Sequence, residues 1–191
     1  MKIMPIVSSG DGDFQGDVLS NALKNRVVYM TGEIDDTTST LVNAQIQFLA
    51  SQSNADIRLY VNSPGGSVTS GLSIVDTMRT CGCDVQVVVA GIAASMAAII
   101  VAAGTPGKRR ILPHSLMMIH QPSIGHVSGK ESDIKVISEY ITGQRKVLDQ
   151  MLADFSKQPL KKVKRDTQSD YYLTASEAVQ YGLVDSIVGE E

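Results

Sequence analysis

The 191-residue chain has no tryptophan, only two cysteines and few charged residues. Lys, Arg, Asp and Glu make up 19% of the chain, against roughly 25% in an average soluble protein, while apolar residues reach 43%. This balance excludes an intrinsically disordered chain and favours burial of part of the surface against other subunits. The net charge is -3 and no basic run exceeds residues 108–110, so we expect binding to neither nucleic acid nor an anionic membrane.

The cysteines, Cys81 and Cys83, are separated by one residue. A disulfide across so short a loop is strained, and two thiols with three histidines make no recognisable zinc set. We therefore predict reduced thiols and no metal site. The first ten residues, MKIMPIVSSG, contain no long apolar segment of the secretory type, which predicts a cytoplasmic protein.

One apolar stretch, Val85 to Gly104, has the length of a membrane span but not its uniformity. Its first half is β-branched and its second half is rich in alanine, with Gly91 between them. This change of character predicts a buried strand over 85–90, a turn at Gly91 and a buried helix over 95–103.

Strands and helices alternate along the rest of the chain. Strands are predicted at 26–31, 56–62, 109–113 and 116–120, and helices at 17–25, 38–51 and 70–78. A connector at 121–130 precedes a long helix with Ile134, Ile137 and Ile141 on one face. A capping box from Thr174 to Glu177 opens a last helix that ends at Gly182. The alternation predicts an α/β fold with a parallel sheet, in one domain spanning residues 1–191.

Ser95 is a candidate nucleophile because it stands where a buried strand passes into an alanine-rich helix. A helix N-terminus offers unpaired amides and a positive potential, which suit a developing oxyanion. The segment GIAASMAA follows the logic of a nucleophile elbow without its G-x-S-x-G pattern, and a serine that merely caps the helix is the alternative. Gly65 and Gly66 follow another strand and allow close backbone approach. An oxyanion hole needs such an approach, but an ordinary loop needs it too.

His120 ends the strand LMMIH, and Asp166 and Asp170 lie in KRDTQSD. A histidine at a strand end is usually structural, and two aspartates in a polar segment are usually a solvated charged turn. The residues alone leave both alternatives open.

Four segments in order, NSPGGSVTSGLSIVDTM, GIAASMAA, LPHSLMMIHQP and RDTQSDYYLTASEAVQYGLVDSI, resemble the Clp protease proteolytic subunits, the ClpP family, from about residue 17 to 188. The resemblance implies a serine endopeptidase. Ser95 matches the family's nucleophile, His120 its general base and Asp170 the carboxylate that orients the histidine. Gly66 and Met96 match the two amides of the oxyanion hole.

The same resemblance implies a crotonase-like (ClpP-type) ββα spiral, assembled as a homo-oligomer of two stacked heptameric rings around a chamber. Residues 121–155 match the handle that joins the rings, and residues 1–16 take the place of the axial-loop segment. Unfolded polypeptides are the implied substrates, delivered by an AAA+ unfoldase such as ClpX, ClpA or ClpC. That partner uses the ATP, since this chain has no G-x-x-x-x-G-K-[ST] loop, and no cofactor is expected here.

Further residues take implied binding roles. An extended substrate is expected to add as a strand between Ser67–Val68 on one side and Gln121, Pro122 and Ile124 on the other, held by backbone pairing. Tyr60, Val88 and Leu112 match the hydrophobic pocket that receives the unfoldase.

The chain departs from the family pattern in residues 1–16, at Gln168–Ser169 where charged residues pair between rings, and at Arg58 and Arg110 where an aromatic is common. Two alternatives therefore stay open. One is a non-catalytic or weakly active ring subunit that supports a paralogous chain, and the other is a crotonase-type acyl-CoA enzyme.

Overall fold

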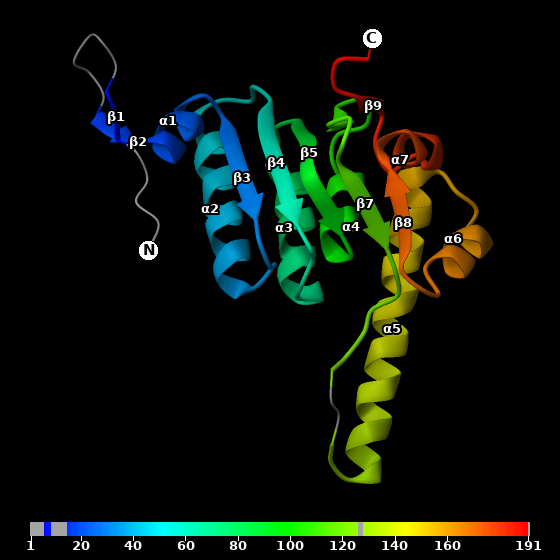
Figure 1. The fold of residues 1–191 in the computed structure, drawn as a ribbon. Coiled ribbons are helices and arrows are strands. Elements are labelled where there is room, and N and C mark those ends of the chain that lie inside the picture. The colour runs from blue at the N-terminus through cyan, green and yellow to red at the C-terminus, as the bar shows by residue number, and fades with distance from the viewer. Residues whose placement is uncertain (1–5, 9–14, 126–127, 191) are drawn as a thin grey trace.

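A computed structural model describes residues 6–8, 15–125 and 128–190. The first half of the chain forms β1 (Ile6–Ser8), β2 (Gln15–Asp17), α1 (Val18–Lys24), β3 (Val27–Thr31), α2 (Asp36–Gln52), β4 (Ile57–Ser63), α3 (Val68–Thr80), β5 (Val85–Ala94) and α4 (Met96–Ala102). The second half forms β6 (Arg109–Ile111), β7 (Leu116–Ile119), α5 (Glu131–Ser156), α6 (Leu160–Asp166), β8 (Tyr171–Thr174), α7 (Ala175–Tyr181) and β9 (Ser186–Ile187). Figure 1 follows this order from blue to red.

The strands confirm the predicted α/β class with a largely parallel sheet. Seven of them form one sheet in the order β3-β4-β5-β6-β9, with β7 paired to the far end of β5 and β8 paired to β7. Every pairing in this sheet is parallel except that of β7 with β8. The short strands β1 and β2 pair with each other, antiparallel and apart from the sheet.

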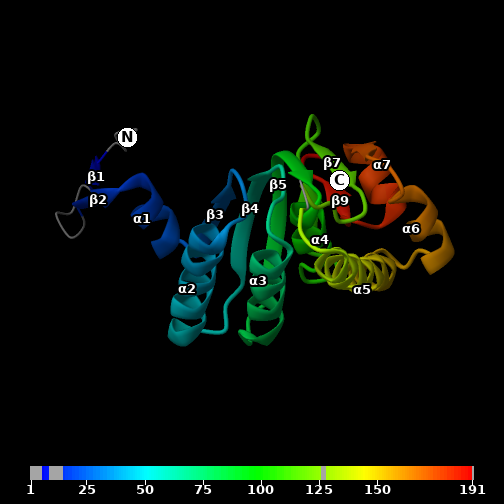
Figure 2. The ribbon, with the colours of Figure 1, turned by 90° about the horizontal axis from the view of Figure 1, so that it is seen from below.

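The helices cover one face of the sheet at β3, β4 and β5 and leave the other face open (Figure 2). Strand β4 shows why, because its residues alternate in burial: Ile57, Leu59 and Val61 are fully buried, whereas Arg58 is exposed. Helix α2 buries Val42, Ile46 and Leu49 at the matching helical spacing.

The expected turn at Gly91 was wrong, because β5 runs straight through this residue to Ala94. Gly91 has a φ of +117°, and a side chain there would collide with the Asn62 amide. The Gly91 amide donates to Ser115 Oγ at 2.8 Å, and after this point β5 exchanges β6 for β7 as its partner. The apolar stretch is nevertheless a strand followed by a short helix, as predicted, and no helix among the described residues is long and apolar enough to cross a membrane.

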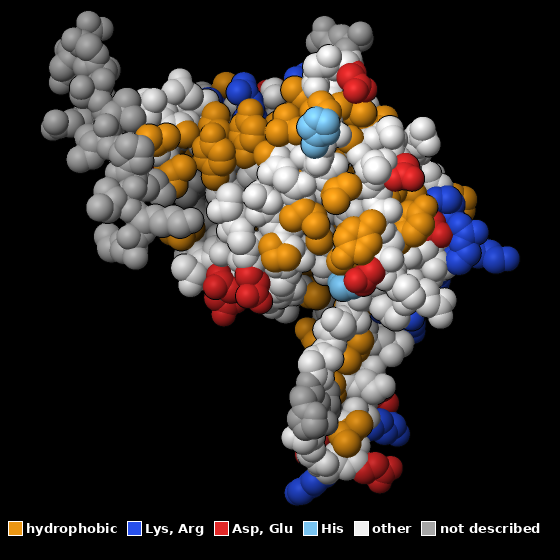
Figure 3. Space-filling model, viewed as in Figure 1, with side chains coloured by type: hydrophobic (Ala, Val, Ile, Leu, Met, Phe, Trp, Pro, Cys, Tyr) orange, Lys and Arg blue, Asp and Glu red, His pale blue; other side chains and the backbone are white. Residues whose placement is uncertain are grey.

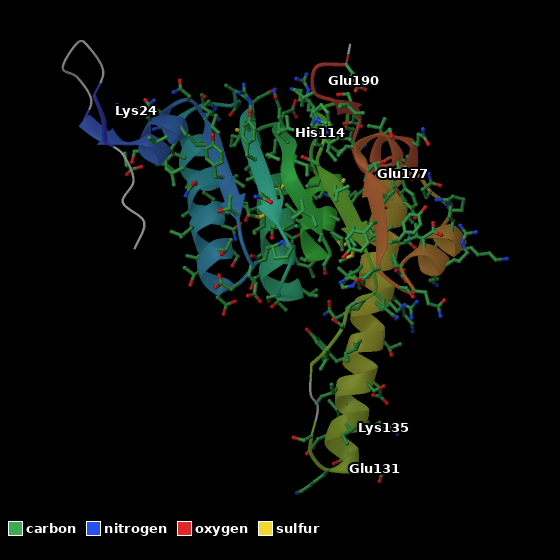
Figure 4. All side chains as sticks on the ribbon, viewed as in Figure 1. Lys24, His114, Glu131, Lys135, Glu177 and Glu190 are labelled. Carbon is green, nitrogen blue, oxygen red and sulfur yellow. The ribbon has the colours of Figure 1, made fainter. Side chains whose placement is uncertain are left out.

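The long helix α5 is confirmed, and its first half projects away from the body of the molecule (Figure 1). In Figure 4, Glu131 and Lys135 lie near the far tip, where side chains point outward from the ribbon. Its exposed apolar side chains include Val136 and Tyr140, which the expected face did not contain, and Leu148 is its first buried apolar residue.

Several elements were not predicted, namely the short strands β1, β2, β8 and β9 and the helix α6. The helices α2 and α3 each begin two residues earlier than expected. The capping box at Thr174 and the left-handed Gly182 at the end of α7 are confirmed, and both cysteines are free thiols. Most of the expected axial-loop segment, residues 1–5 and 9–14, lies outside the described residues.

Candidate active site

Ser95 is the single residue between β5 and α4, and its backbone is strained. Its φ of +56° and ψ of -123° place a residue with a Cβ in a region that glycine favours. Strain of this kind persists only where surrounding structure enforces it, and here the Ser95 amide donates to the Met118 carbonyl of β7 at 2.8 Å. The sharp strand-to-helix turn presents the hydroxyl outside the sheet, as in a nucleophile elbow.

His120 and Asp170 face each other because of the register of β7 and β8. Ile119 pairs with Tyr171 in this antiparallel ladder. The next residues beyond this pair are His120, which follows β7, and Asp170, which precedes β8. The His120 Nδ1 atom is 2.9 Å from Asp170 Oδ1, and its Nε2 atom is 2.8 Å from Ser95 Oγ. The structure thus brings together the three side chains proposed from the sequence, over separations of 25 and 50 residues.

The glycine pair before α3 lies directly against Ser95. A Cβ atom on Gly65 would stand 2.7 Å from the Ser95 Cβ and 3.1 Å from the Met96 nitrogen, so only glycine fits there. Gly66 is held by a bridge to Ile34, whose amide donates to the Gly65 carbonyl at 2.8 Å. The sequence left an ordinary loop and a close backbone approach open as alternatives at Gly65, because nothing local identifies Ser95 as its neighbour.

Gly66 and Met96 are the candidate oxyanion donors. The Gly66 amide donates a hydrogen bond to no acceptor among the described residues. Met96 is the first residue of α4, where backbone amides have no acceptor within the helix. The buried Met96 side chain fills the space left by Gly71 of α3, where a Cβ would come within 2.2 Å of the Met96 Cγ. This packing fixes the start of α4 against α3.

The arrangement is suited to acyl transfer. With Asp170 accepting from Nδ1–H, the His120 Nε2 atom is free to accept the Ser95 hydroxyl proton as the oxygen attacks a carbonyl. The carboxylate then stabilises the imidazolium, and amides at Gly66 and Met96 suit the tetrahedral oxyanion. The site is open in the single chain, because the side chains of His120 and Asp170 are 22% and 55% exposed.

The residues expected to bind substrate lie on both sides of Ser95 but are not equally available. Ser67 caps α3, and its amide already donates to the Ile34 carbonyl at 2.7 Å, while Val68 begins the helix. The Gln121 amide is likewise engaged, donating to the Thr167 carbonyl at 2.6 Å. Beyond Pro122, residues 123–125 are exposed and belong to no helix or strand, and their described backbone groups form no hydrogen bonds with the rest of the described chain. Ile124, 46% exposed, lies in this free stretch.

The expected partner pocket falls on the open face of the sheet. Register places Tyr29, Tyr60, Val88 and Arg110 in one row across β3, β4, β5 and β6, and the rings of Tyr29 and Tyr60 stack with centroids 5.4 Å apart. Leu112, half-buried, follows the end of β6. Figure 3 shows hydrophobic side chains gathered over the upper parts of β3, β4 and β5. The exposed Arg110 at the end of this row gives it a positive charge.

The interpretation of Asp166 as part of a solvated turn was wrong, whereas Asp170 is exposed. The Asp166 side chain is 6% exposed and pairs with Lys162 and Arg165 of α6, and it accepts the Tyr181 hydroxyl at 3.1 Å. Burial alone would raise the pKa of Asp166, but its hydrogen bonds to Arg165, Lys162 and Tyr181 prevail and lower the pKa below the usual value. Asp166 therefore fastens α6 to α7, away from His120.

Comparison with known proteins gives a consistent result. A family model described as Clp protease matches residues 10–191. The chain is 44% identical, over 191 aligned residues, to the "ATP-dependent Clp protease proteolytic subunit" of Ligilactobacillus salivarius (strain UCC118), and the alignment covers 98% of this chain and 96% of that relative.

Proposed function

This chain belongs to the Clp protease family, and from that premise we propose that it is the proteolytic subunit of an ATP-dependent protease, a serine endopeptidase in which Ser95, His120 and Asp170 perform the chemistry. The observation that carries the residue assignment is the pair of contacts made by one imidazole, to Ser95 Oγ at 2.8 Å and to Asp170 Oδ1 at 2.9 Å. Family membership favours this function over an acyl-CoA enzyme.

In the proposed reaction His120 removes the Ser95 proton while the hydroxyl oxygen attacks the scissile carbonyl. The amides of Gly66 and Met96 hold the oxyanion, and the loss of one such donor typically costs about 3 kcal/mol of barrier. His120 then protonates the leaving amine, and water enters by the reverse path to release the acyl group from Ser95. No metal or cofactor is needed for these steps.

The substrate in this proposal is an extended, unfolded polypeptide. The free backbone of residues 123–125 supports strand addition on one side of Ser95. Ser67 contributes its position but not its amide, which Ile34 occupies. Backbone pairing reads little of the substrate sequence, which suits cleavage of many proteins into short peptides.

The proposed assembly is a single domain of residues 1–191 with the ClpP-type spiral, repeated in two stacked heptameric rings in the cytoplasm. Two observations support it: the exposed candidate site needs an enclosure that one chain lacks, and α5 projects with apolar side chains exposed at Ile134, Val136, Tyr140 and Val147. An AAA+ unfoldase docks on the open sheet face at Tyr60, Val88 and Leu112. Arg58 and Arg110 place positive charge on this face, where the family commonly has an aromatic residue. The second candidate arrangement is therefore a ring that also contains a paralogous subunit.

Active-site labelling tests the proposal directly. A fluorophosphonate should label the chain at Ser95 alone, and Ser95→Ala should abolish both labelling and peptide cleavage while leaving the native mass unchanged. Loss of the nucleophile in a serine protease removes on the order of 10⁶ in kcat. A chain that assembles but is neither labelled nor active would instead support the non-catalytic ring subunit.

A further inference from the structure

A buried carboxylate lies at the base of the projecting helix, outside the contacts made by Ser95, His120 and Asp170. Asp149 is only 2% exposed, next to Leu148 in the first buried turn of α5. Its Oδ2 atom is 3.6 Å from the Arg145 Nε and accepts no hydrogen bond from the described residues. A buried charge is costly unless it is paired and hydrogen-bonded. Asp149 is the one charged residue among the buried residues described for α5, so it needs a partner nearby.

That partner is Thr167, which is fully buried between α6 and β8. Its hydroxyl is 2.9 Å from Asp149 Oδ1 and also 2.9 Å from the Val163 carbonyl. The hydroxyl has one proton and cannot donate fully to both acceptors. A carboxylate is the stronger acceptor, so Asp149 of α5 fixes the side chain of Thr167 at the end of α6.

The backbone of the same residue holds the chain next to His120. The Thr167 carbonyl accepts the Gln121 amide at 2.6 Å, and the Gln168 carbonyl accepts the Gln121 Nε2 at 2.9 Å. Gln121 follows His120 directly, and Thr167 precedes Asp170 by three residues. These two bonds therefore join the segments that carry His120 and Asp170, beyond the last pair of the β7–β8 ladder.

We propose that Asp149 is a positioning residue for the peptidase reaction: through Thr167 it holds the segments of His120 and Asp170 in the separation that keeps their side chains in contact. The inference rests on the proposed function, because it concerns the rate at Ser95. Asp149 touches none of the reacting groups. Its removal frees Thr167 to turn toward Val163 and loosens the segment that leads to Asp170, and a misplacement of about 1 Å at a reacting group costs about 10²-fold in rate.

The test compares two disruptive variants with one conservative variant. Asp149→Leu and Thr167→Val each remove the contact with little change in volume. We expect kcat for a fluorogenic peptide to fall about 10²-fold in each with KM nearly unchanged, and the Ser95 labelling rate to fall by a similar factor. The double variant should lose little more than either single variant, because both break one contact. Asp149→Asn should retain activity close to that of the parent, since its amide still bonds the Thr167 hydroxyl.

Asp154→Leu is the matched control, because Asp154 is an exposed aspartate on the same helix, and its kcat should stay at the parent value. If Asp149→Leu fails to assemble by native mass measurement, Thr167→Val decides the question. A parent-like kcat in a folded disruptive variant, or an equal loss in Asp149→Asn, overturns the positioning role. Absence of Ser95 labelling in the parent chain overturns the proposed function, and the positioning role falls with it.

Discussion

Replacing Gly65 with alanine tests the closest contact of the candidate site. Gly65 has a φ of +95°, and an added Cβ would stand 2.6 Å from the Ala94 carbonyl oxygen and 2.7 Å from the Ser95 Cβ. The left-handed backbone costs an L-residue roughly 1–2 kcal/mol, and overpacking against atoms that cannot move costs roughly 1–3 kcal/mol more. Gly65→Ala should therefore destabilise the fold by about 2–5 kcal/mol.

Gly82→Ala is the control that separates the two costs. Gly82 has a similar φ of +79° but no atom within 4 Å of the added Cβ, so this variant bears only the backbone cost. For a domain of this size each kcal/mol lowers Tm by roughly 2–4 °C. The Tm of Gly65→Ala should accordingly lie about 2–12 °C below that of Gly82→Ala.

The two variants should differ still more in reactivity. The added methyl group at Gly65 pushes on Ser95 itself, and a displacement of about 1 Å costs about 10²-fold. A methyl group at Gly82 meets no atom within 4 Å and so pushes on nothing. The assays are thermal denaturation and the rate of fluorophosphonate labelling, measured on folded protein. Equal Tm values and equal labelling rates for the two variants would refute the close approach of Gly65 to Ser95.

Three further predictions concern the carboxylates and the projecting helix. Asp170→Asn should lower kcat by about 10⁴-fold, whereas Asp166→Asn should lower Tm and leave kcat nearly unchanged; the reverse order in peptide assays would contradict the assignment of Asp170. Ile137→Glu or Ile141→Glu should convert double rings into single rings with reduced peptidase rates, because a charge enters an apolar contact, and sedimentation that still shows double rings would contradict the packing. Burial would raise the pKa of Asp185, but the hydrogen bonds and charge of Arg109 outweigh burial and lower the pKa. This pair therefore stabilises the fold above about pH 4, and the stabilisation is lost as the pH falls through the lowered pKa of Asp185 in the folded state. The free energy of unfolding of Asp185→Asn should accordingly change less than that of the parent over this acid range.

The sequence predicted those features that depend on neighbouring residues. The capping box at Thr174 and the helix end at Gly182 follow from local spacing, and the structure has both where expected. Ser95, His120 and Asp170 were found by resemblance, since each residue alone had an ordinary structural explanation. Their contact depends on the register of β7 and β8, which no local pattern specifies.

The errors have a common physical origin in contacts between distant segments. Glycine is typical of a turn, yet the Gly91 amide donates to the Ser115 hydroxyl and β7 pairs with β5 beyond this point. The strand therefore continues through Gly91. Asp166 lies in a polar segment typical of a solvated turn, yet the hydroxyl of Tyr181, 15 residues further along the chain, donates to its buried carboxylate. In both cases the partner that decides the outcome lies outside any local window.

The strand order also fixes when a newly made chain acquires its chemistry. Ser95 directly follows β5, whereas Asp170 directly precedes β8 and lies 75 residues further along the chain (170 minus 95). At a synthesis rate of roughly 5–20 residues per second, about 4 to 15 seconds separate the appearance of the two residues. During that interval the nascent chain carries a serine without the carboxylate that orients its base. The order of the strands along the chain thus delays the contact between His120 and Asp170 until residue 170 has been synthesised.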